Sequence, residues 1–341
     1  MPTDPAQLHE DAGAFDAHSD ILYAAVRERR LGNDGVVGEQ FLPGMRAGGI
    51  DMRVAAIYLD ADEAREPATR RALTIAETFH REIEATDGLE AATTAREVRE
   101  GAESDGVTLL LGMEGAEPLK GDLLVLDAFH RLGLRVLGPT HSRRNMAADG
   151  AFFEPTRSGE PGGLSPFGVD AVERCGDLGI VVDVSHLNEP GFWDVAEYAS
   201  NPFIASHSNC RALRDHPRNL WDEQLRAVGD AGGVVGINAL RAFLHGDDPG
   251  VDAVVDHVEH AVEVAGIDHA GLGFDFYDYN LEYMSPTEQK YMIDVTTAEG
   301  LAGDADVGNV TPALLDRGFD PGEVRKILKD NFVRVFESVL P

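Results

Sequence analysis

Lysine is scarce in this chain, which carries only four among its 341 residues: Lys120, Lys290, Lys326 and Lys329. Lysine and arginine together number 29 against 60 aspartates and glutamates, for a formal net charge of −31. This charge argues against binding to nucleic acid or to an anionic membrane surface. Because the acids are dispersed along the chain, they repel one another over the whole surface, and salt screens that repulsion. The composition predicts a halophilic, salt-adapted protein, with an ordinary acidic cytosolic enzyme as the alternative.

Cysteine is also scarce, and Cys175 and Cys210 form neither a disulfide framework nor a CxxC pair. We interpret both as reduced thiols, which predicts a cytoplasmic protein. Apolar runs are short as well: none approaches the roughly 18 residues of a membrane-spanning helix. The polar, acidic residues 1–13 lack the basic start and apolar run of a secretion signal, and we expect this segment to be flexible.

What the chain does have is a regular alternation of apolar, β-branched runs with stretches of helical character. Eight runs are candidate strands: 14–22, 49–59, 107–115, 134–142, 179–186, 201–208, 232–240 and 270–276. Helices are expected at 66–82, 121–132, 165–178, 189–200, 219–231 and 251–265. Near-continuous apolar strands between helices indicate a parallel sheet that is covered on both faces. Eight such units predict an α/β protein with one catalytic domain over residues 1–341, a closed (β/α)8 barrel of the TIM type.

Histidines and acids stand at the carboxyl ends of six of these runs, where such a barrel places its active site. They are His18, Asp20, Glu114, His141, Asp183, His186, His207 and Asp275. Alternate residues of a strand share one face, so His18 and Asp20 can bind the same ion. Imidazole and carboxylate groups suit zinc, and a barrel mouth with this many ligands can hold two ions. A carboxylate must then bridge the ions, and Glu114 is the best candidate.

Each of these residues alone has a plainer interpretation, because a single histidine at a strand end is more often structural than a ligand. Only their joint placement carries the prediction. We interpret Asp16 and Asp183 as core acids or as acids that orient a ligand histidine. His257 and His260 are spaced like a helical metal pair, but they lie on an outer helix, where packing or solvation is expected. The long loop 143–164 is a candidate functional loop.

Taken together, the motifs resemble the membrane dipeptidase (renal dipeptidase) family of zinc metallopeptidases. The resemblance covers nearly the whole chain and includes "FDAHSDIL", "GMEGAEPL", "LGPTHS", "LGIVVDVSHLNEPGFWDV", "PFIASHSNCRAL", "GLGFDF" and the closing "NFVRVF". It implies a distorted (β/α)8 barrel, a centre with two Zn²⁺ ions and hydrolysis of dipeptides. By this resemblance His18 and Asp20 would hold the first zinc, Glu114 would bridge both ions, and His186 and His207 would hold the second.

The resemblance also implies the residues that handle the substrate. His141 would contact the oxygen of the tetrahedral intermediate, Arg218 would help to bind the substrate, and Asp275 would face its free amine and transfer the proton. A hydroxide shared by the two metal ions would attack the peptide carbonyl. Small dipeptides are the implied partners, with neither nucleic acid nor membrane, and a homodimer is the candidate assembly.

Segment 277–309 departs from the family pattern, since it is longer than expected and its amino-acid sequence differs from the family motif. It directly follows the last predicted strand, so we expect it to form part of the substrate pocket or a subunit contact. Two other functions stay open. A different metal-dependent amidohydrolase is disfavoured by the HxD motif and by the lack of lysine between residues 121 and 289. A metal-free barrel with a binding role is disfavoured because all five ligand positions hold ligand-type residues.

Overall fold

The protein is described by a computed structural model that covers residues 4–61, 63–152, 159, 161–284, 289 and 294–341. Its centre is an 8-stranded sheet in which the strands run in the order β6-β5-β4-β2-β1-β8-β7, with β3 paired to β4 outside this path. All of these pairings are parallel. The strands are β1 (Ala14–Ser19), β2 (Ile50–Tyr58), β3 (Leu89–Ala91), β4 (Val107–Glu114), β5 (Leu134–Gly138), β6 (Val181–Val182), β7 (Val235–Ile237) and β8 (Ala270–Leu272).

Residues 204 and 205 close this sheet into a barrel. Isolated parallel bridges join Asp183 to Ile204 and Ala205 to Val235, so the segment lies between β6 and β7. We expected a full strand over 201–208. The backbone N–H groups of Ser206 and His207 donate instead to the side chains of Asp183 and Ser185, which ends the ladder after two residues. The predicted (β/α)8 barrel is confirmed, with β3 as an additional short strand that the sequence analysis missed.

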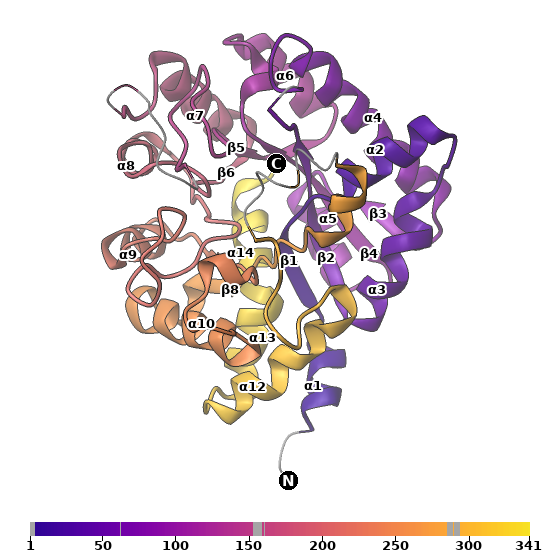
Figure 1. Ribbon diagram of the computed structural model, residues 1–341, viewed down its shortest axis with the longest axis vertical. Coiled ribbons are helices and arrows are strands. Elements are labelled where there is room, and N and C mark those ends of the chain that lie inside the picture. Colours follow the sequence, from indigo (N-terminus) through magenta and orange to yellow (C-terminus); the bar gives the residue numbers. More distant parts are fainter. Residues whose placement is uncertain (1–3, 62, 153–158, 160, 285–288, 290–293) are drawn as a thin grey trace.

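Helices surround the sheet (Figure 1). They are α1 (Pro5–Ala12), α2 (Ile21–Leu31), α3 (Leu42–Ala47), α4 (Ala68–Ala85), α5 (Ala95–Ala102), α6 (Leu123–Arg131), α7 (Pro166–Leu178), α8 (Glu189–Tyr198), α9 (Asp222–Asp230), α10 (Val251–Ala265), α12 (Val310–Asp316), α13 (Pro321–Arg325) and α14 (Asn331–Val339). The six predicted helices correspond to α4 and α6 to α10. Ser165 and Asn188 cap α7 and α8 by accepting backbone N–H bonds, which explains where these helices begin.

The N-terminal segment differs from the expected flexible residues 1–13, because residues 5–12 form helix α1. Asp4 caps this helix by accepting the N–H of Ala6, and Pro5 suits its first turn. The buried His9 ring hydrogen-bonds Thr311 Oγ1 at 2.7 Å and the Gly48 carbonyl at 2.8 Å. These contacts, which connect residues distant in sequence, fix α1 against the barrel and could not be read from its polar composition.

The barrel interior is filled from one end by α14. Phe15, at the start of β1, stacks between Phe332 and Phe336 of α14, with ring centroids 5.3 Å apart in both pairs. Val54 of β2 and Leu110 of β4 belong to the same apolar cluster. The amino ends of the strands are therefore closed by packing, and the carboxyl ends are left for the polar site. Within the described residues, no helix combines the length and apolar composition that a bilayer crossing requires.

Candidate metal centre

Five predicted metal ligands converge at the carboxyl ends of the strands. His18 lies near the end of β1, Asp20 immediately precedes α2, and Glu114 ends β4. His186 follows β6, and His207 follows the bridge at residues 204 and 205. All five side chains are buried, with 1% to 7% of their surface exposed. Burial of so many ionisable groups is costly unless they are paired or bind a cation.

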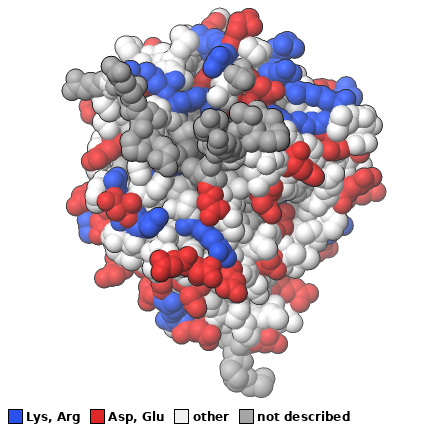
Figure 2. All heavy atoms as spheres, in the orientation of Figure 1, with Lys and Arg blue, Asp and Glu red and all other residues white. Residues whose placement is uncertain are grey.

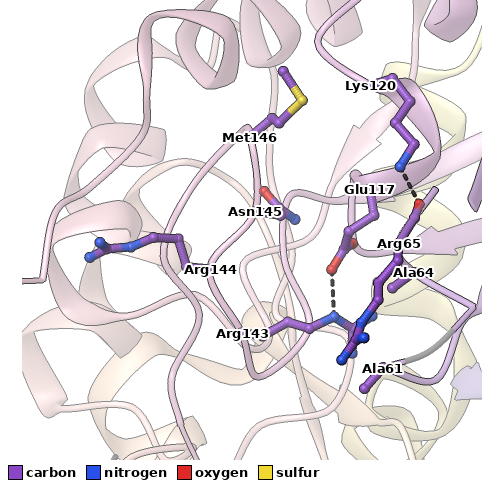
Figure 3. A pocket seen from close by; sticks show the side chains of 9 residues that line it. All are labelled: Ala61, Ala64, Arg65, Glu117, Lys120, Arg143, Arg144, Asn145 and Met146. Carbon is purple, nitrogen blue, oxygen red and sulfur yellow. Dashed lines mark hydrogen bonds and ion pairs between the residues drawn. The ribbon is translucent and has the colours of Figure 1, made fainter. Parts of the chain in front are cut away.

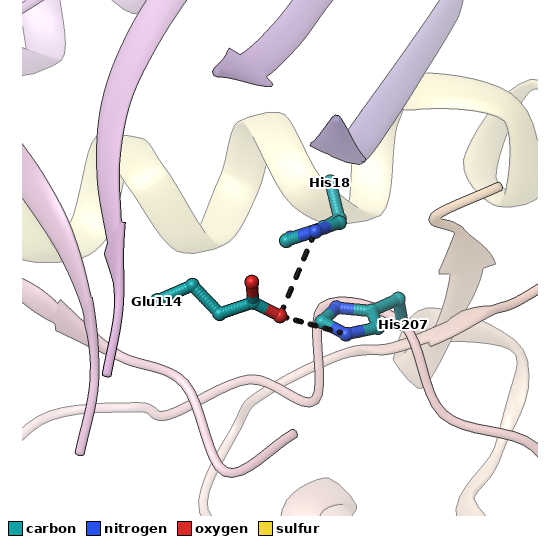
Figure 4. Close-up of side chains that lie close together, drawn as sticks. All are labelled: His18, Glu114 and His207. Atoms are coloured by element: carbon teal, nitrogen blue, oxygen red, sulfur yellow. Dashed lines mark ion pairs between the residues drawn. The ribbon is translucent and has the colours of Figure 1, made fainter. Parts of the chain in front are cut away.

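Glu114 lies at the centre of this group, as Figure 4 shows for three of its members. Its Oε1 atom is 2.9 Å from His186 Nε2, 3.5 Å from His207 Nε2 and 3.7 Å from His18 Nε2. One carboxylate oxygen thus faces histidines from three different segments. This is the position that a bridging ligand would occupy.

The electrostatics of the group fit a cation. Burial lowers the pKa of His186 and of His207 well below the usual range, so both rings are neutral, and their Nε2 atoms lie 2.8 Å apart. Burial also disfavours a charge on His18, but Glu114, Asp20 and Asp275 raise its pKa to about 10. The Oδ1 atom of Asp20 is buried and has no hydrogen-bond partner in the described part of the chain. Lone pairs and carboxylates that converge in this way suit a divalent metal ion.

Three sets of potential ligands can be distinguished, and within each set the ligand atoms lie within 4.8 Å of one another. The sets are His18 with Glu114 and His207, Glu114 with His141 and His186, and His18 with Asp20 and Asp275. Glu114 and His18 each belong to two sets, so the donors overlap rather than form separate sites. The family resemblance implied that His186 and His207 bind the same ion, whereas these sets group His207 with His18 and His186 with His141.

His141 and Asp275 adjoin these ligands. The His141 ring packs against the His186 ring at a tilt of 31°, with centroids 4.3 Å apart. Burial, followed by the charge of Arg143, lowers the pKa of His141 well below the usual value. Asp275 Oδ1 is 3.8 Å from His18 Nε2. Burial raises the pKa of Asp275 to about 6, although Asn238 Nδ2 donates to its Oδ2 at 2.8 Å. Asn238 was not predicted as a site residue, because a single asparagine in the apolar run 232–240 carries no signal of its own.

Arg218 is buried, with 3% of its surface exposed, and its contacts are neutral. It donates to the His207 carbonyl at 3.1 Å and to Ser208 Oγ at 3.4 Å. Its Nε atom has no hydrogen-bond partner among the described residues. Burial lowers the pKa of Arg218 to about 10, and the nearby Asp275 and Glu114 oppose that shift. A buried guanidinium without a paired carboxylate is suited to bind an anionic group of a ligand.

Asp183 orients a candidate ligand, as we predicted. Its carboxylate accepts from Ser206 Oγ and from the N–H groups of Ser185 and Ser206. Ser206 Oγ in turn lies 2.7 Å from His207 Nδ1, which leaves the His207 Nε2 atom directed toward Glu114. This is the arrangement by which an outer acid fixes the orientation of a ligand histidine.

Asp16 is a core acid, which is one of the two roles that we considered for it. It is fully buried, accepts the N–H of Phe274 at 2.9 Å and pairs with Arg53 at 2.9 Å. Arg53 also forms a two-pronged ion pair with Asp304. Asp16 therefore fixes the backbone beside Asp275, and it does so through an ion-pair network that extends into segment 277–309. The sequence spacing gave no sign of Arg53 as the partner.

The backbone is strained at two candidate site residues. Among the described non-glycine residues, only His186 (φ 69°), Asp275 (φ 59°) and Lys120 (φ 52°) have positive φ angles. Such conformations are uncommon for residues with a Cβ atom and persist where the surrounding contacts impose them. The fold therefore imposes an unusual backbone conformation on His186 and Asp275, two of the predicted site residues.

Other predicted features have structural roles. His257 is fully buried on α10 and accepts the N–H of Cys210 at 3.0 Å, while His260 pairs with Asp222 at 2.8 Å. Both histidines therefore serve packing and helix contacts, as expected. Cys175 and Cys210 are buried free thiols. Loop 143–164 and segment 277–309 lie in part outside the described residues.

An aromatic group was missed by the sequence analysis. Tyr23, Tyr58 and Tyr277 pack together, with centroid distances of 5.7 to 6.4 Å, and Tyr58 also contacts the His141 ring at 5.1 Å. The buried hydroxyl of Tyr277 has no hydrogen-bond partner within the described residues. Scattered tyrosines carry no periodic signal, so only the fold could bring them to one side of the metal centre.

The model of the membrane dipeptidase family (peptidase family M19) matches residues 4–340. The chain belongs to this family. A protein from Claviceps purpurea named "Dipeptidase tcpJ" is 34% identical over 258 residues, which cover 74% of this chain and 56% of that protein. A Klebsiella pneumoniae protein known as "Uncharacterized protein in pqqA 5'region" is 32% identical over 252 residues, covering 72% of this chain and 87% of that one. The matched region is thus less than two thirds of the Claviceps protein.

Solved structures agree with the family. A metallo peptidase from Rhodobacter sphaeroides, liganded with a phosphinate mimic of the dipeptide L-Ala-D-Ala, is similar with a TM-score of 0.84 and 29% identity, over 96% of this chain and 99% of that one. An amidohydrolase from Pseudomonas aeruginosa has a TM-score of 0.81 at 23% identity, over 99% of both chains, and shows the fold alone. The prediction of an enzyme of the metallo-dipeptidase class is confirmed at the level of the family.

Proposed function

We propose that this protein is a binuclear metal-dependent dipeptidase that hydrolyses the peptide bond of small dipeptides. The observation that carries the proposal is the position of Glu114, whose Oε1 atom faces His18, His186 and His207 at 2.9 to 3.7 Å. A carboxylate shared by histidines on different strands is what a two-metal site needs. Membership of the dipeptidase family supports the choice of substrate.

In this proposal, which follows the family resemblance, His18 and Asp20 would hold one ion, His186 and His207 would hold the other, and Glu114 would be shared by both. Zinc is the proposed metal, because nitrogen and oxygen ligands of this kind suit it. When bound, the two ions would acidify a shared water and polarise the substrate carbonyl. The chain contributes the alignment of these ligands, through Asp183 and Ser206 behind His207.

His141 is the proposed donor to the developing oxyanion. Its depressed pKa keeps the ring neutral, and nearby cations would favour the neutral ring further. Ser142 Oγ lies 2.9 Å from His141 Nδ1. If Ser142 donates this bond, His141 carries its proton on Nε2 and can donate it to the substrate oxygen, where a positioned donor lowers the barrier.

Asp275 and Arg218 are proposed to recognise the two charged ends of a dipeptide. Asp275 would accept the ammonium group and pass a proton to the leaving amine, and Asn238 holds its carboxylate in place. Arg218 would bind the terminal carboxylate with its planar fork, since its present contacts are to neutral groups. A site that reads both termini would favour dipeptides over longer peptides.

Metal analysis combined with a dipeptide panel tests the proposal. We expect two divalent ions for each chain and hydrolysis of free dipeptides, including some with a D-residue at the second position. A metal-loaded protein that cleaves cyclic or N-acyl amides but not dipeptides would instead favour a different amidohydrolase. A folded protein that binds no metal would favour a binding role.

Several further properties are part of the proposal. The dispersed net charge of −31 supports a salt-adapted protein, and the two buried free thiols support a reducing, cytoplasmic compartment. One catalytic domain over residues 1–341 and a homodimer complete the proposed organisation. Size measurement by light scattering in molar salt tests the assembly.

A further inference from the structure

Two side chains of opposite charge lie on separate segments at the carboxyl ends of the strands. Arg218 belongs to the segment after the bridges at residues 204 and 205, and Asp275 follows β8. In the proposed function they bind the carboxylate and the ammonium group of a dipeptide. Because these two groups are joined by a fixed number of bonds, the separation of Arg218 and Asp275 decides which peptide lengths can reach both. The contacts that set this separation therefore bear on substrate specificity.

The charge of the protein makes the position of Arg218 important. Acidic side chains are scattered over the face of the molecule in Figure 2, and the general field of a chain with a net charge of −31 repels a carboxylate. Arg143, which lines a pocket of about 430 Å³, is itself paired with Glu117 at 2.7 Å (Figure 3). Arg218 donates instead to neutral groups, the His207 carbonyl and Ser208 Oγ. A substrate carboxylate must therefore be bound at short range, where small displacements of the guanidinium matter.

Asn209 connects to Asp275 through one intermediate residue, Asn238. The Asn209 side chain is fully buried and makes a two-pronged contact with the backbone of Asn238. Its Oδ1 atom accepts the Asn238 N–H at 2.8 Å, and its Nδ2 atom donates to the Asn238 carbonyl at 3.2 Å. The side chain of Asn238 in turn donates to Asp275 Oδ2 at 2.8 Å, while its own Oδ1 atom accepts the Leu240 N–H at 2.6 Å. The amide of Asn209 therefore fixes the backbone from which Asp275 is held.

Asn209 is also connected to the backbone that carries Arg218. The carbonyl of Asn209 accepts the N–H of Leu220, two residues after Arg218, at 2.8 Å. Asn219 Nδ2 donates to the Phe243 carbonyl at 2.9 Å, and the same carbonyl accepts a second bond from Asn209 Nδ2 at 3.4 Å. Hydrogen bonds on both sides of Asn209 thus join the segment of Arg218 to that of Asp275, although the two residues are 57 positions apart in the chain.

We propose that Asn209 is a positioning residue that sets the separation of Arg218 and Asp275 and thereby restricts the enzyme to dipeptides. The inference rests on the proposed dipeptidase function and concerns the specificity of the same site. Without the amide of Asn209, the N–H and carbonyl of Asn238 lose these bonds in a buried place. The two charged residues are then no longer held across the barrel mouth, and a displacement of about 1 Å in a positioned group can lower a rate by roughly 100-fold.

The test compares kcat/KM for Ala-Ala and for Ala-Ala-Ala in protein of measured metal content. The wild type should favour the dipeptide. Asn209→Leu, which nearly keeps the size of the side chain and removes its amide, should lower that ratio by about tenfold or more without changing metal content. Asn209→Ser should lower it in the same direction and decides the question if the leucine variant does not fold. Asn331→Leu is the matched control and should keep the ratio, because the buried Asn331 amide donates to the carbonyls of Ile267 and Ala270 at the amino end of β8.

A double variant separates positioning from a general loss of stability. In the Arg218→Ala background, Asn209→Leu should change the ratio little further, because no guanidinium is left to be displaced. Additive effects of the two substitutions would overturn the inference, and so would an equal fall of the ratio in Asn331→Leu. An unchanged ratio in the Asn209 variants, or equal hydrolysis of both peptides by the wild type, would also overturn it and leave hydrolysis of dipeptides intact. If the metal-loaded wild type does not hydrolyse Ala-Ala, the proposed function fails and the inference fails with it.

Discussion

A single carboxylate connects the candidate ligands, and its replacement gives the sharpest test at the residue scale. Glu114→Gln keeps the size of the side chain and removes its charge. We expect both metal sites to lose affinity, because Glu114 Oε1 lies 3.7 Å from His18 Nε2 and 2.9 Å from His186 Nε2. Metal content after dialysis should fall well below two ions for each chain. Glu82→Gln is the matched control, since Glu82 is equally buried but bonds the Val37 N–H. Full occupancy with unchanged activity in Glu114→Gln would refute the bridging role.

Arg218 offers a second residue-scale test. A charge-assisted, two-pronged contact with the substrate carboxylate is worth about 1.5–3 kcal/mol, or roughly 10- to 100-fold in rate. The wild type should therefore hydrolyse a free dipeptide much faster than its C-terminal amide. Arg218→Ala should reduce that preference without changing metal content. An unaltered preference for the free dipeptide would show that Arg218 does not bind the carboxylate. If Arg218→Lys restores only part of this preference, the result would support a role for the planar, two-pronged geometry of the guanidinium group.

At the scale of elements, α10 contains a group that makes stability depend on pH. Burial, followed by the charges of His245 and His260, lowers the pKa of His257 to about 3. The folded state therefore holds His257 neutral, while the unfolded chain takes up a proton near pH 6.5. The contribution of His257 is complete above pH 6.5 and falls by about 1.4 kcal/mol for each unit below it, until about pH 3. Urea unfolding of His257→Gln should show a flatter dependence over this range. An equal slope in both proteins would rule out His257 as the source.

The link between β2 and segment 277–309 gives a test of a second element. Asp304 pairs with Arg53, which is 1% exposed and also contacts Asp16. Removal of one charged partner of a buried arginine costs about 1.5–3 kcal/mol, so Asp304→Asn should lower the free energy of unfolding by this amount. Asp316→Asn, on the exposed part of α12, is the control and should change it by less than about 0.5 kcal/mol. Equal stability of the two variants would mean that the network is not stabilising.

Prediction from the sequence succeeded where one signal is repeated. The alternation of apolar runs and helices located most of the barrel. The structure also brings His18, Glu114 and His207 together, as their places at strand ends led us to expect, while their role as ligands stays a prediction. Prediction failed where a long-range contact decides the structure. Segment 201–208 has a strand-like composition, yet Asp183 and Ser185 take up its N–H groups. No local pattern reveals such partners.

At the scale of the whole molecule, the charge of −31 should make stability depend on salt. The screening length falls from about 10 Å at 0.1 M to about 3 Å at 1 M, which removes most repulsion between dispersed acids. The Tm should rise on moving from dilute buffer to molar KCl, and by more than in sucrose of equal osmolality. A flat or falling Tm would leave an ordinary acidic enzyme as the better description.

The barrel is weakly closed at Ile204 and Ala205, where single bridges replace a ladder of strand hydrogen bonds. His207 lies just beyond these bridges, and Glu114 stands on β4, elsewhere around the barrel. An ion held by both residues would join the two parts of the barrel, so its binding energy would also oppose local opening. Amide hydrogens at 204–208 should therefore exchange more slowly in the metal-loaded protein than in the stripped one, while those in α4 change little. Binding of the metal and closure of the barrel at residues 204 and 205 would then be one cooperative event.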